Sequence, residues 1–256
     1  MTEGASLWLP PHRRAAGRYS MTVELRSMAD ENAVAALNAT TELFVAAANQ
    51  GAFPAGGVPP SSARLTVAPG RVDVPSQRLM WELEGQGFDL FGFELLRNMF
   101  DRLARLDVDV RHIVVGGHGP EGKPRLKPEP TYLTEYEAYP AISPHIRFDV
   151  RREGGGDGKF RRCLVELTTT VGASHVGNVR SWVASWFRLL EAAAFALPVG
   201  YAWETDCVGG DTTIFDERAI EITVNRLQAS ECAWHALVNM LETGCGGTPV
   251  SKMTIE

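Results

Sequence analysis

The chain has 256 residues, of which 45% are apolar and 22% charged, a composition typical of a folded globular protein rather than a disordered one. Its formal net charge is −6. Proteins that bind nucleic acid usually carry a basic excess, because neutralising phosphates drives their affinity, so this balance argues against a nucleic-acid partner.

Cysteine usage and the first residues favour a cytoplasmic setting. The four cysteines are dispersed and form no C-x-x-C pair, so a reducing compartment is the better interpretation. Only three apolar residues, 7–9, precede two prolines, too few for the core of a secretory signal. The most apolar later stretch, 182–199, is interrupted by charges and a proline, which predicts a buried helix and no membrane contact.

The first part of the chain predicts one β-α-β-β-α-β unit. Residues 1–20 are basic and proline-containing and are expected to be a flexible N-terminal extension, so structure begins near Met21. Asp30 and Asp89 are the expected starts of two helices. Within this unit, 21–118, strands are predicted at 22–26, 63–67, 76–84 and 108–115.

The last part, 144–256, repeats this order behind an extra leading strand near 146–151. One predicted helix is centred on Trp186, and Ser230 is the expected cap of the other. Strands are predicted at 160–170, 199–205, 218–227 and 249–256.

The two halves also match in sequence at an offset of 141 residues. The motif L-x-N-M at 96–99 recurs at 237–240, although two amphipathic helices can resemble each other by chance. The matched strand positions are Leu79, Trp81, Leu83 and Val114 in the first half and Ile220, Ile222, Val224 and Ile255 in the second. We therefore predict an α+β fold of two tandem ferredoxin-like (βαββαβ) halves, with antiparallel sheets covered by helices and an internal duplication.

The linker between the halves, 119–143, is rich in proline and tyrosine. It holds three of the five tyrosines, interleaved with two glutamates. Flexibility alone requires no aromatic residues, so these tyrosines either cover the junction of the halves or face a partner. The expected partner-binding residues here are Tyr132, Glu135, Tyr136, Glu137 and Tyr139.

A second predicted partner surface is an acidic segment, 204–217, which contains no basic residue. Its carboxylates could bind Mg²⁺ or Ca²⁺, although the EF-hand spacing is missing, or they could face a basic protein. The plain alternative is a solvated loop. The residues concerned are Glu204, Asp206, Asp211, Asp216 and Glu217.

Residues with catalytic or metal-binding chemistry form no complete constellation. His118, between glycines at a predicted strand end, or His112 could act as a general acid or base, although a turn leaving a sheet is the simpler interpretation. Cys232 and His235 stand at i, i+3 on a predicted helix, but structural zinc normally shows such ligand pairs on both sides. We therefore predict no cofactor and no metal.

These patterns favour a non-enzymatic, intracellular protein-binding role. Tyrosines beside carboxylates are typical of inhibitor surfaces, where aromatic anchors dominate the binding energy. One concrete form is an immunity protein that neutralises a toxin, with a basic protein as partner. Two alternatives stay open: an enzyme with a pocket between the half-sheets and a histidine acid/base, and an RNA-binding duplicated ferredoxin-like protein, which the net charge opposes.

Overall fold

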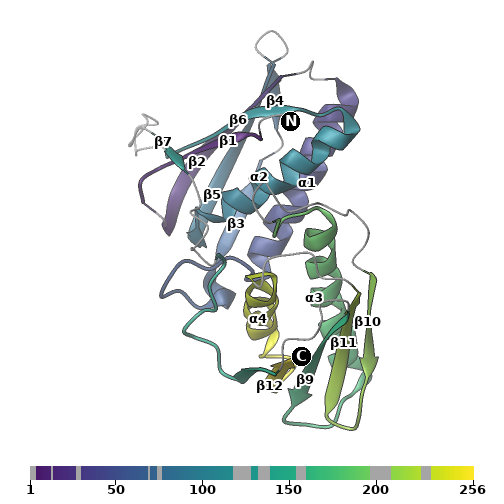
Figure 1. Ribbon diagram of the computed structural model, residues 1–256. Coiled ribbons are helices and arrows are strands. Elements are labelled where there is room, and N and C mark those ends of the chain that lie inside the picture. The colour runs from purple at the N-terminus through teal and green to yellow at the C-terminus, as the bar shows by residue number, and fades with distance from the viewer. Residues whose placement is uncertain are drawn as a thin grey trace.

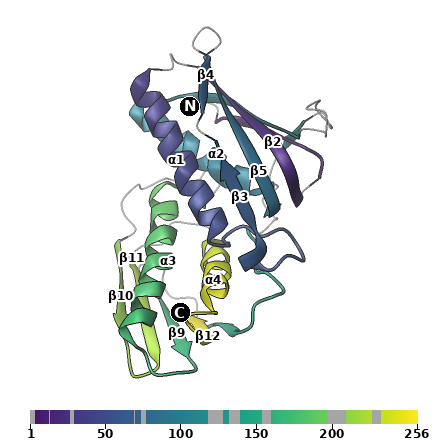
Figure 2. The ribbon, with the colours of Figure 1, turned by 180° about the vertical axis from the view of Figure 1, so that it is seen from behind.

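The computed structural model shows a mixed α+β chain of two lobes, each with one β-sheet and two α-helices (Figure 1). Seen from both sides, the helices lie between the two sheets (Figure 2). Within the described residues, no helix is long and apolar enough to span a membrane. The structure describes residues 4–12, 14–26, 30–68, 70–73, 77–117, 128–131, 139–153, 160–196, 209–225 and 232–256.

The first lobe contains a seven-stranded sheet in the order β3-β5-β2-β6-β1-β7, with β4 also paired to β5. Its strands are β1 (Ser6–Leu9), β2 (Arg14–Leu25), β3 (Arg64–Val67), β4 (Arg71–Asp73), β5 (Arg78–Asp89), β6 (Val110–Gly117) and β7 (Glu129–Thr131). Its helices are α1 (Glu31–Asn49) and α2 (Gly92–Arg102), with the short 3-10 turns η1 (Pro60–Ser62) and η2 (Leu103–Leu106). Asp30 caps α1 by accepting a hydrogen bond from the Ala33 amide.

The second lobe contains a five-stranded sheet in the order β10-β11-β9-β12-β8. Its strands are β8 (Asp149–Arg152), β9 (Phe160–Leu167), β10 (Gly209–Ile214), β11 (Ala219–Asn225) and β12 (Val250–Ile255). Its helices are α3 (Ala173–Glu191) and α4 (Cys232–Gly244).

Strands at corresponding places in the chain occupy corresponding places in the two sheets. The order β3-β5-β2-β6-β1 in the first lobe is matched by β10-β11-β9-β12-β8 in the second. The leading strand of each lobe runs parallel to the strand that completes the β-α-β-β-α-β order, β1 to β6 and β8 to β12. The remaining pairs along this shared path are antiparallel.

The apolar alternation in the sequence correctly identified the buried face of the central strands. Leu79, Trp81, Leu83, Ile220, Ile222 and Val224 are each at most 3% exposed. Trp186 is also fully buried, where it packs 5.0 Å from Trp234 and donates from Nε1 to the Ala233 carbonyl. The buried apolar side chains form one continuous cluster through both lobes.

The N-terminal residues differ from the expected flexible extension. Residues 6–9 form β1, and residues 14–20 form the first part of β2, which lies between β5 and β6. Leu7 and Leu9 are buried, whereas Arg14 and Arg18 point outward. The sequence obscured this strand because a register shift near Arg14 and a positive φ at Gly17 interrupt its alternation.

The structure also differs from two other predictions, the strand at 199–205 and the match of Val114 with Ile255. The strand expected at 199–205 lies outside the described residues, and β10 at 209–214 is the strand that pairs with β11. Ile255 pairs with Cys163, and in the first lobe the corresponding pair is Val115 with Met21 rather than Val114. A slip of one residue reverses the face of a strand, so Val114 belongs to the open face.

The lobes are joined by reciprocal hydrogen bonds from two asparagines. Asn98 of α2 donates from Nδ2 to the carbonyl of Ala194, 3.0 Å away in the other lobe. Asn239 of α4 donates in the opposite direction, to the carbonyl of Ala52 at 3.5 Å. These are the two asparagines of the repeated L-x-N-M motif.

The two accepting carbonyls stand at equivalent helix ends. The amides of Ala52 and Ala194 each donate to the carbonyl five residues earlier, in the last turn of α1 and α3. The preceding residue is left-handed in both, with φ of 84° at Gly51 and 59° at Ala193. This helix ending places each carbonyl at the junction, within reach of an asparagine from the other lobe.

Replacing Asn239 by alanine is expected to lower the free energy of unfolding by about 1–3 kcal/mol, because buried backbone groups would lose their partners. Asn239 is fully buried, accepts from the Ser143 amide at 2.9 Å and donates to the Ala141 carbonyl at 3.0 Å. Urea unfolding measures the loss. The control is Asn178→Ala, since among the described residues the Asn178 side chain bonds within the second lobe, to Thr248. Equal losses in both variants would contradict the special role of the junction.

Candidate functional site

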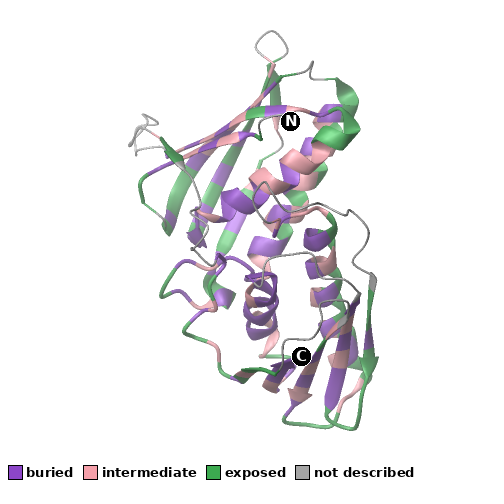
Figure 3. Cartoon of the chain, in the orientation of Figure 1, coloured by how far each residue is buried: buried purple, intermediate pink, exposed green. Residues whose placement is uncertain are grey.

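The turn between β10 and β11 exposes two large apolar side chains between carboxylates. Ile214 is 60% exposed and Phe215 is 52% exposed. Asp216 and Glu217 follow them and are also exposed. We call residues 214–217 the hairpin tip; Figure 3 shows most of β10 and this turn as exposed.

Backbone hydrogen bonds hold the hairpin tip in place. The Phe215 amide donates to the Ala219 carbonyl at 2.9 Å, and Asp216 Oδ1 accepts from the Arg218 amide at 2.7 Å. The Glu217 carbonyl accepts from the Val171 amide, in the segment that follows β9. A turn fixed in this way presents its side chains with little conformational entropy to lose on binding.

The strand that leads to the tip is the edge of the second sheet. The guanidinium of Arg180, on α3, donates twice to the Thr212 carbonyl of β10, at 3.1 and 2.9 Å. The Phe187 ring leaves no room for a side chain at Gly210. The Thr212 carbonyl at this edge is therefore already hydrogen-bonded to Arg180, which limits its pairing with a strand of another molecule.

The acidic segment is only partly described. Asp211, Asp216 and Glu217 lie on the hairpin and are exposed, whereas Glu204 and Asp206 lie outside the described residues. Asp211 belongs to β10 rather than to a loop, and its carboxylate accepts from the Thr212 amide.

The tyrosine-rich linker is mostly undescribed, and its one described tyrosine is buried. Tyr132, Glu135, Tyr136 and Glu137 lie outside the described residues. Tyr139 is 7% exposed and its ring centroid lies 6.4 Å from that of Phe91. This overturns the expectation that Tyr139 faces a partner, because its side chain packs at the junction of the lobes.

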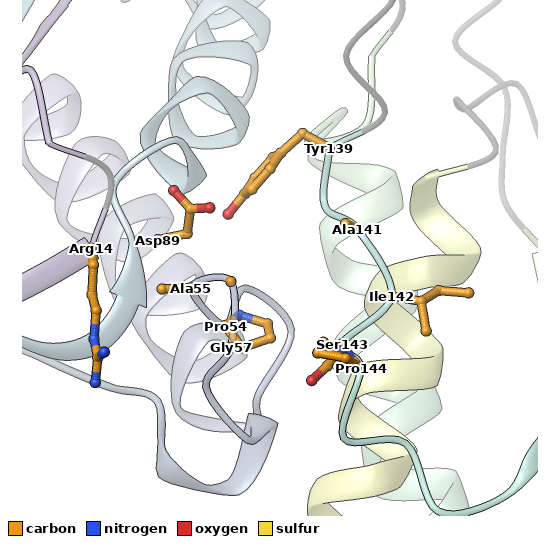
Figure 4. A pocket seen from close by; sticks show the side chains of 11 residues that line it. Arg14, Pro54, Ala55, Gly57, Asp89, Tyr139, Ala141, Ile142, Ser143 and Pro144 are labelled. Atoms are coloured by element: carbon orange, nitrogen blue, oxygen red, sulfur yellow. The ribbon is translucent and has the colours of Figure 1, made fainter.

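Tyr139 borders a cavity of about 700 Å³ between the first lobe and the segment 139–144 that leads to the second lobe. We call it the interlobe cavity; its lining is Arg14, Asp89, Tyr139 and residues 54–57 and 141–144. In Figure 4 the Asp89 carboxyl and the Tyr139 hydroxyl point toward each other, while Arg14 extends away from both. Asp89 is 4% exposed and accepts from the Phe91 amide at 3.0 Å, where α2 begins.

Of the two candidate histidines, the structure describes only His112, and it does not lie at the junction of the lobes. His112 lies on the open face of the first sheet, beside a hollow of about 380 Å³, and none of the described residues that line the interlobe cavity is a histidine. Its Nδ1 is 2.6 Å from Ser6 Oγ. His118 lies outside the described residues.

The Cys232–His235 pair has no free histidine nitrogen for a metal. His235 Nε2 accepts from Arg152 Nη2 at 2.7 Å, and its Nδ1 donates to the Pro140 carbonyl at 2.8 Å. Cys232 is buried. No group of three metal-ligating side chains gathers within the described part of the chain.

A buried ion pair supports the junction contact of Asn98. Arg97 donates to Glu94 Oε2 at 2.8 Å and, through Nη2, to Asn98 Oδ1 at 3.0 Å. Glu94 is 1% exposed, and burial raises the pKa of its carboxyl, against the opposing effect of the Arg97 charge. Arg97 thus orients the Asn98 amide so that its Nδ2 faces the other lobe.

The sequence missed the apolar part of the hairpin tip. The five carboxylates of 204–217 dominate the composition of this segment, and Ile214 and Phe215 stand between them without a periodic pattern. The usable signal was a pair of large apolar residues directly followed by two carboxylates between two strands.

Comparisons with known proteins leave the chain without a family. No family model matches it, and neither does any curated protein. The solved structures that resemble it include a mutant of the ferredoxin protease FusC in complex with Arabidopsis ferredoxin, and the periplasmic protease PqqL from Escherichia coli. Both are 9% identical with a TM-score of 0.21; 88% and 91% of this chain is covered, but only 33% and 34% of theirs. The chain spans about a third of those proteins, and a likeness this weak assigns neither fold nor activity.

The raised pKa of Glu94 predicts a pH dependence of stability. Because the folded state disfavours the charged carboxylate, Glu94 should stabilise the fold less as the pH rises from its unfolded pKa through its higher folded pKa. The wild-type free energy of unfolding minus that of Glu94→Gln should therefore fall as the pH rises above the ordinary titration range of a glutamate, about pH 4. Urea unfolding at a series of pH values from about 4 upward measures this difference; a difference that is constant or rises with pH would contradict the assignment.

Proposed function

We propose that this chain is a non-enzymatic protein-binding protein whose hairpin tip docks on a protein partner with a basic surface. The observation that carries the proposal is the exposure of Ile214 and Phe215 beside Asp216 and Glu217 on a hydrogen-bonded turn. Large apolar side chains at the centre of an interface supply most of its energy, and charges at the rim supply orientation and association rate.

The arrangement of the tip favours a protein over a small ligand as the occupant. The tip is an exposed turn, whereas sites for small molecules are clefts. Its carboxylates would attract a basic partner through long-range electrostatics, which salt weakens. The net charge of −6 acts in the same direction.

The neutralisation of a toxin, as by an immunity protein, is the specific form of this proposal. It is supported only by the same acidic and apolar surface, which an inhibitor of a basic enzyme would need. The histidine-based enzyme has less support, because His112 and the interlobe cavity lie in different places.

We further infer that the two lobes are copies of one ferredoxin-like unit with a leading strand. Three observations support a duplication: the matched strand order, the matched helix ends at Gly51 and Ala193, and the reciprocal contacts of Asn98 and Asn239. An early dimer of such units would bind through a contact of this reciprocal kind, since a twofold interface repeats each contact.

Replacing Phe215 by serine is expected to weaken binding to the partner by about 2 kcal/mol or more, as loss of a hot spot does. Because Phe215 is 52% exposed, the free energy of unfolding should change by no more than about 0.5 kcal/mol. Quantitative capture from cells of the source organism identifies a partner, and biosensor titration with that purified partner gives the affinity. Glu217→Lys should lower the association rate and its salt dependence.

Matched controls lie on the first lobe. Val72→Ser is the control for Phe215→Ser, because Val72 on β4 is apolar and 40% exposed. Glu42→Lys is the control for Glu217→Lys, because Glu42 on α1 is also an exposed glutamate. A partner bound equally well by the wild type and by Phe215→Ser would place the interface elsewhere.

A further inference from the structure

The open faces of the two sheets differ at equivalent positions. In the first lobe, one row of directly paired residues across β1, β6, β2 and β5 is largely apolar: Trp8, Val114, Thr22 and Met80. The strands at the same places in the second lobe carry the row Arg151, Thr254, Leu164 and Glu221. Trp8 and Met80 therefore stand where the second lobe has charged residues.

The second lobe shows what a solvated face of this sheet requires. Arg151 pairs there with Asp149, and Glu221 pairs with Arg162. Polar and charged side chains of this kind are the usual covering of a sheet face that meets water, whereas Met80 in the first lobe is 42% exposed. The fold does not require the apolar row, because the second lobe forms the same sheet without it.

Three residues of the apolar row line a hollow of about 380 Å³ on the open face of the first sheet. The described lining consists of Trp8, Val114 and Thr22 from this row, with Glu24, Arg78 and His112 from the neighbouring row. The volume lies within the range of roughly 300–1,000 Å³ that small-molecule sites occupy. None of these residues belongs to the hairpin tip, so the hollow is independent of the proposed function.

The charged groups at the hollow neutralise one another. Glu24 Oε2 accepts from Arg78 Nε and Nη2, at 3.3 and 3.1 Å. Arg111 donates to the other carboxylate oxygen, Oε1, at 3.3 Å. Asp73 stands next to Arg78 in the strand register. Because these two cations and two anions balance, the hollow suits an uncharged ligand better than a phosphate.

Two polar groups of the lining are open to a ligand. His112 Nδ1 is 2.6 Å from Ser6 Oγ, and that oxygen accepts from Trp8 Nε1 at 3.4 Å. This arrangement favours the Ser6 proton on the bond to Nδ1 and the His112 proton on Nε2, which makes Nε2 a donor. Within the described residues, neither Nε2 nor the Thr22 hydroxyl has a hydrogen-bond partner. The hydroxyl can both donate and accept.

We propose that this hollow binds the base of a purine nucleoside, taken up as a free small molecule. A purine is flat and uncharged, so it can stack on the apolar row, where Trp8 supplies an aromatic ring. Its ring nitrogens accept hydrogen bonds, which His112 Nε2 can donate, and its polar edge can bond with the Thr22 hydroxyl. A polynucleotide fits less well, because the net charge of −6 repels phosphates.

The test titrates the full chain in a calorimeter with adenosine, guanosine, cytidine and uridine, each at up to about 1 mM. At least one purine nucleoside should bind about tenfold or more tightly than both pyrimidine nucleosides, because stacking increases with the area of the base. The 5′-monophosphate and a single-stranded oligonucleotide of the same base are two further arms.

The second lobe supplies both a substitution and a control. Trp8→Arg, which introduces the residue type of the equivalent position, should weaken binding about tenfold or more, whereas Trp8→Phe keeps an aromatic ring and should stay within about threefold. His112→Ala should weaken binding about fivefold, the effect of losing one hydrogen bond. Lys252→Ala is its matched control, because Lys252 occupies the equivalent place on β12 and should not affect binding.

The proposal stands if a purine nucleoside binds and if both Trp8→Arg and His112→Ala, but not Lys252→Ala, weaken its binding. It is overturned if neither purine nucleoside binds, if pyrimidine nucleosides bind equally well, or if Trp8→Arg or His112→Ala binds as the wild type does. Binding of the monophosphate or the oligonucleotide about tenfold more tightly than the nucleoside would also overturn it, in favour of a site directed at phosphate. Circular dichroism shows whether each variant is folded; if Trp8→Arg is not, His112→Ala and Lys252→Ala decide.

Discussion

The fold of this chain depends on burying its helices on more than one face, with a sheet on one side and the other lobe on the opposite side. α4 shows this most plainly, because ten of its thirteen residues are buried, including residues on every side of the helix. One sheet can cover only one face of a helix, and a helix that is buried all round must have neighbours on its other faces as well. In this chain the first lobe provides them, so the two lobes form one continuous core.

Polar contacts then determine how the lobes fit together. Apolar packing has little directional preference, whereas a hydrogen bond from Asn98 or Asn239 requires its acceptor carbonyl at one place. Both acceptors stand at helix ends with left-handed residues, where the chain turns and leaves a carbonyl without a partner inside the helix. Arg97 pairs with the buried Glu94 and also donates to Asn98 Oδ1, which orients the Asn98 amide toward the Ala194 carbonyl.

With the helices enclosed, the outward features of the molecule lie on the sheets and at the junction. The open face of the second sheet carries ion pairs, such as Arg162 with Glu221 and Lys252 with Glu166, which satisfy each other. Ile214 and Phe215 differ from this pattern because they are large, apolar and exposed. The proposed binding surface is therefore an exception to the distribution of side chains in its own lobe.

The sequence by itself determined the elements whose periodicity is local. Alternation in Leu79, Trp81 and Leu83 predicted a strand with one buried face, and the repeated L-x-N-M motif found the two helices that carry the junction asparagines. Those signals depend on spacing along the chain, which the sequence displays directly.

The tertiary structure alone decided the rest. Residues 6–9 look like a loose terminus until β6 pairs with them, and Tyr139 looks like a contact residue until it packs against Phe91. Arg14 and Asp89 reach one cavity only because β2 and β5 end together. Pairing and burial between distant segments leave no periodic trace in the sequence, which is why the site could be predicted only where it followed a single element.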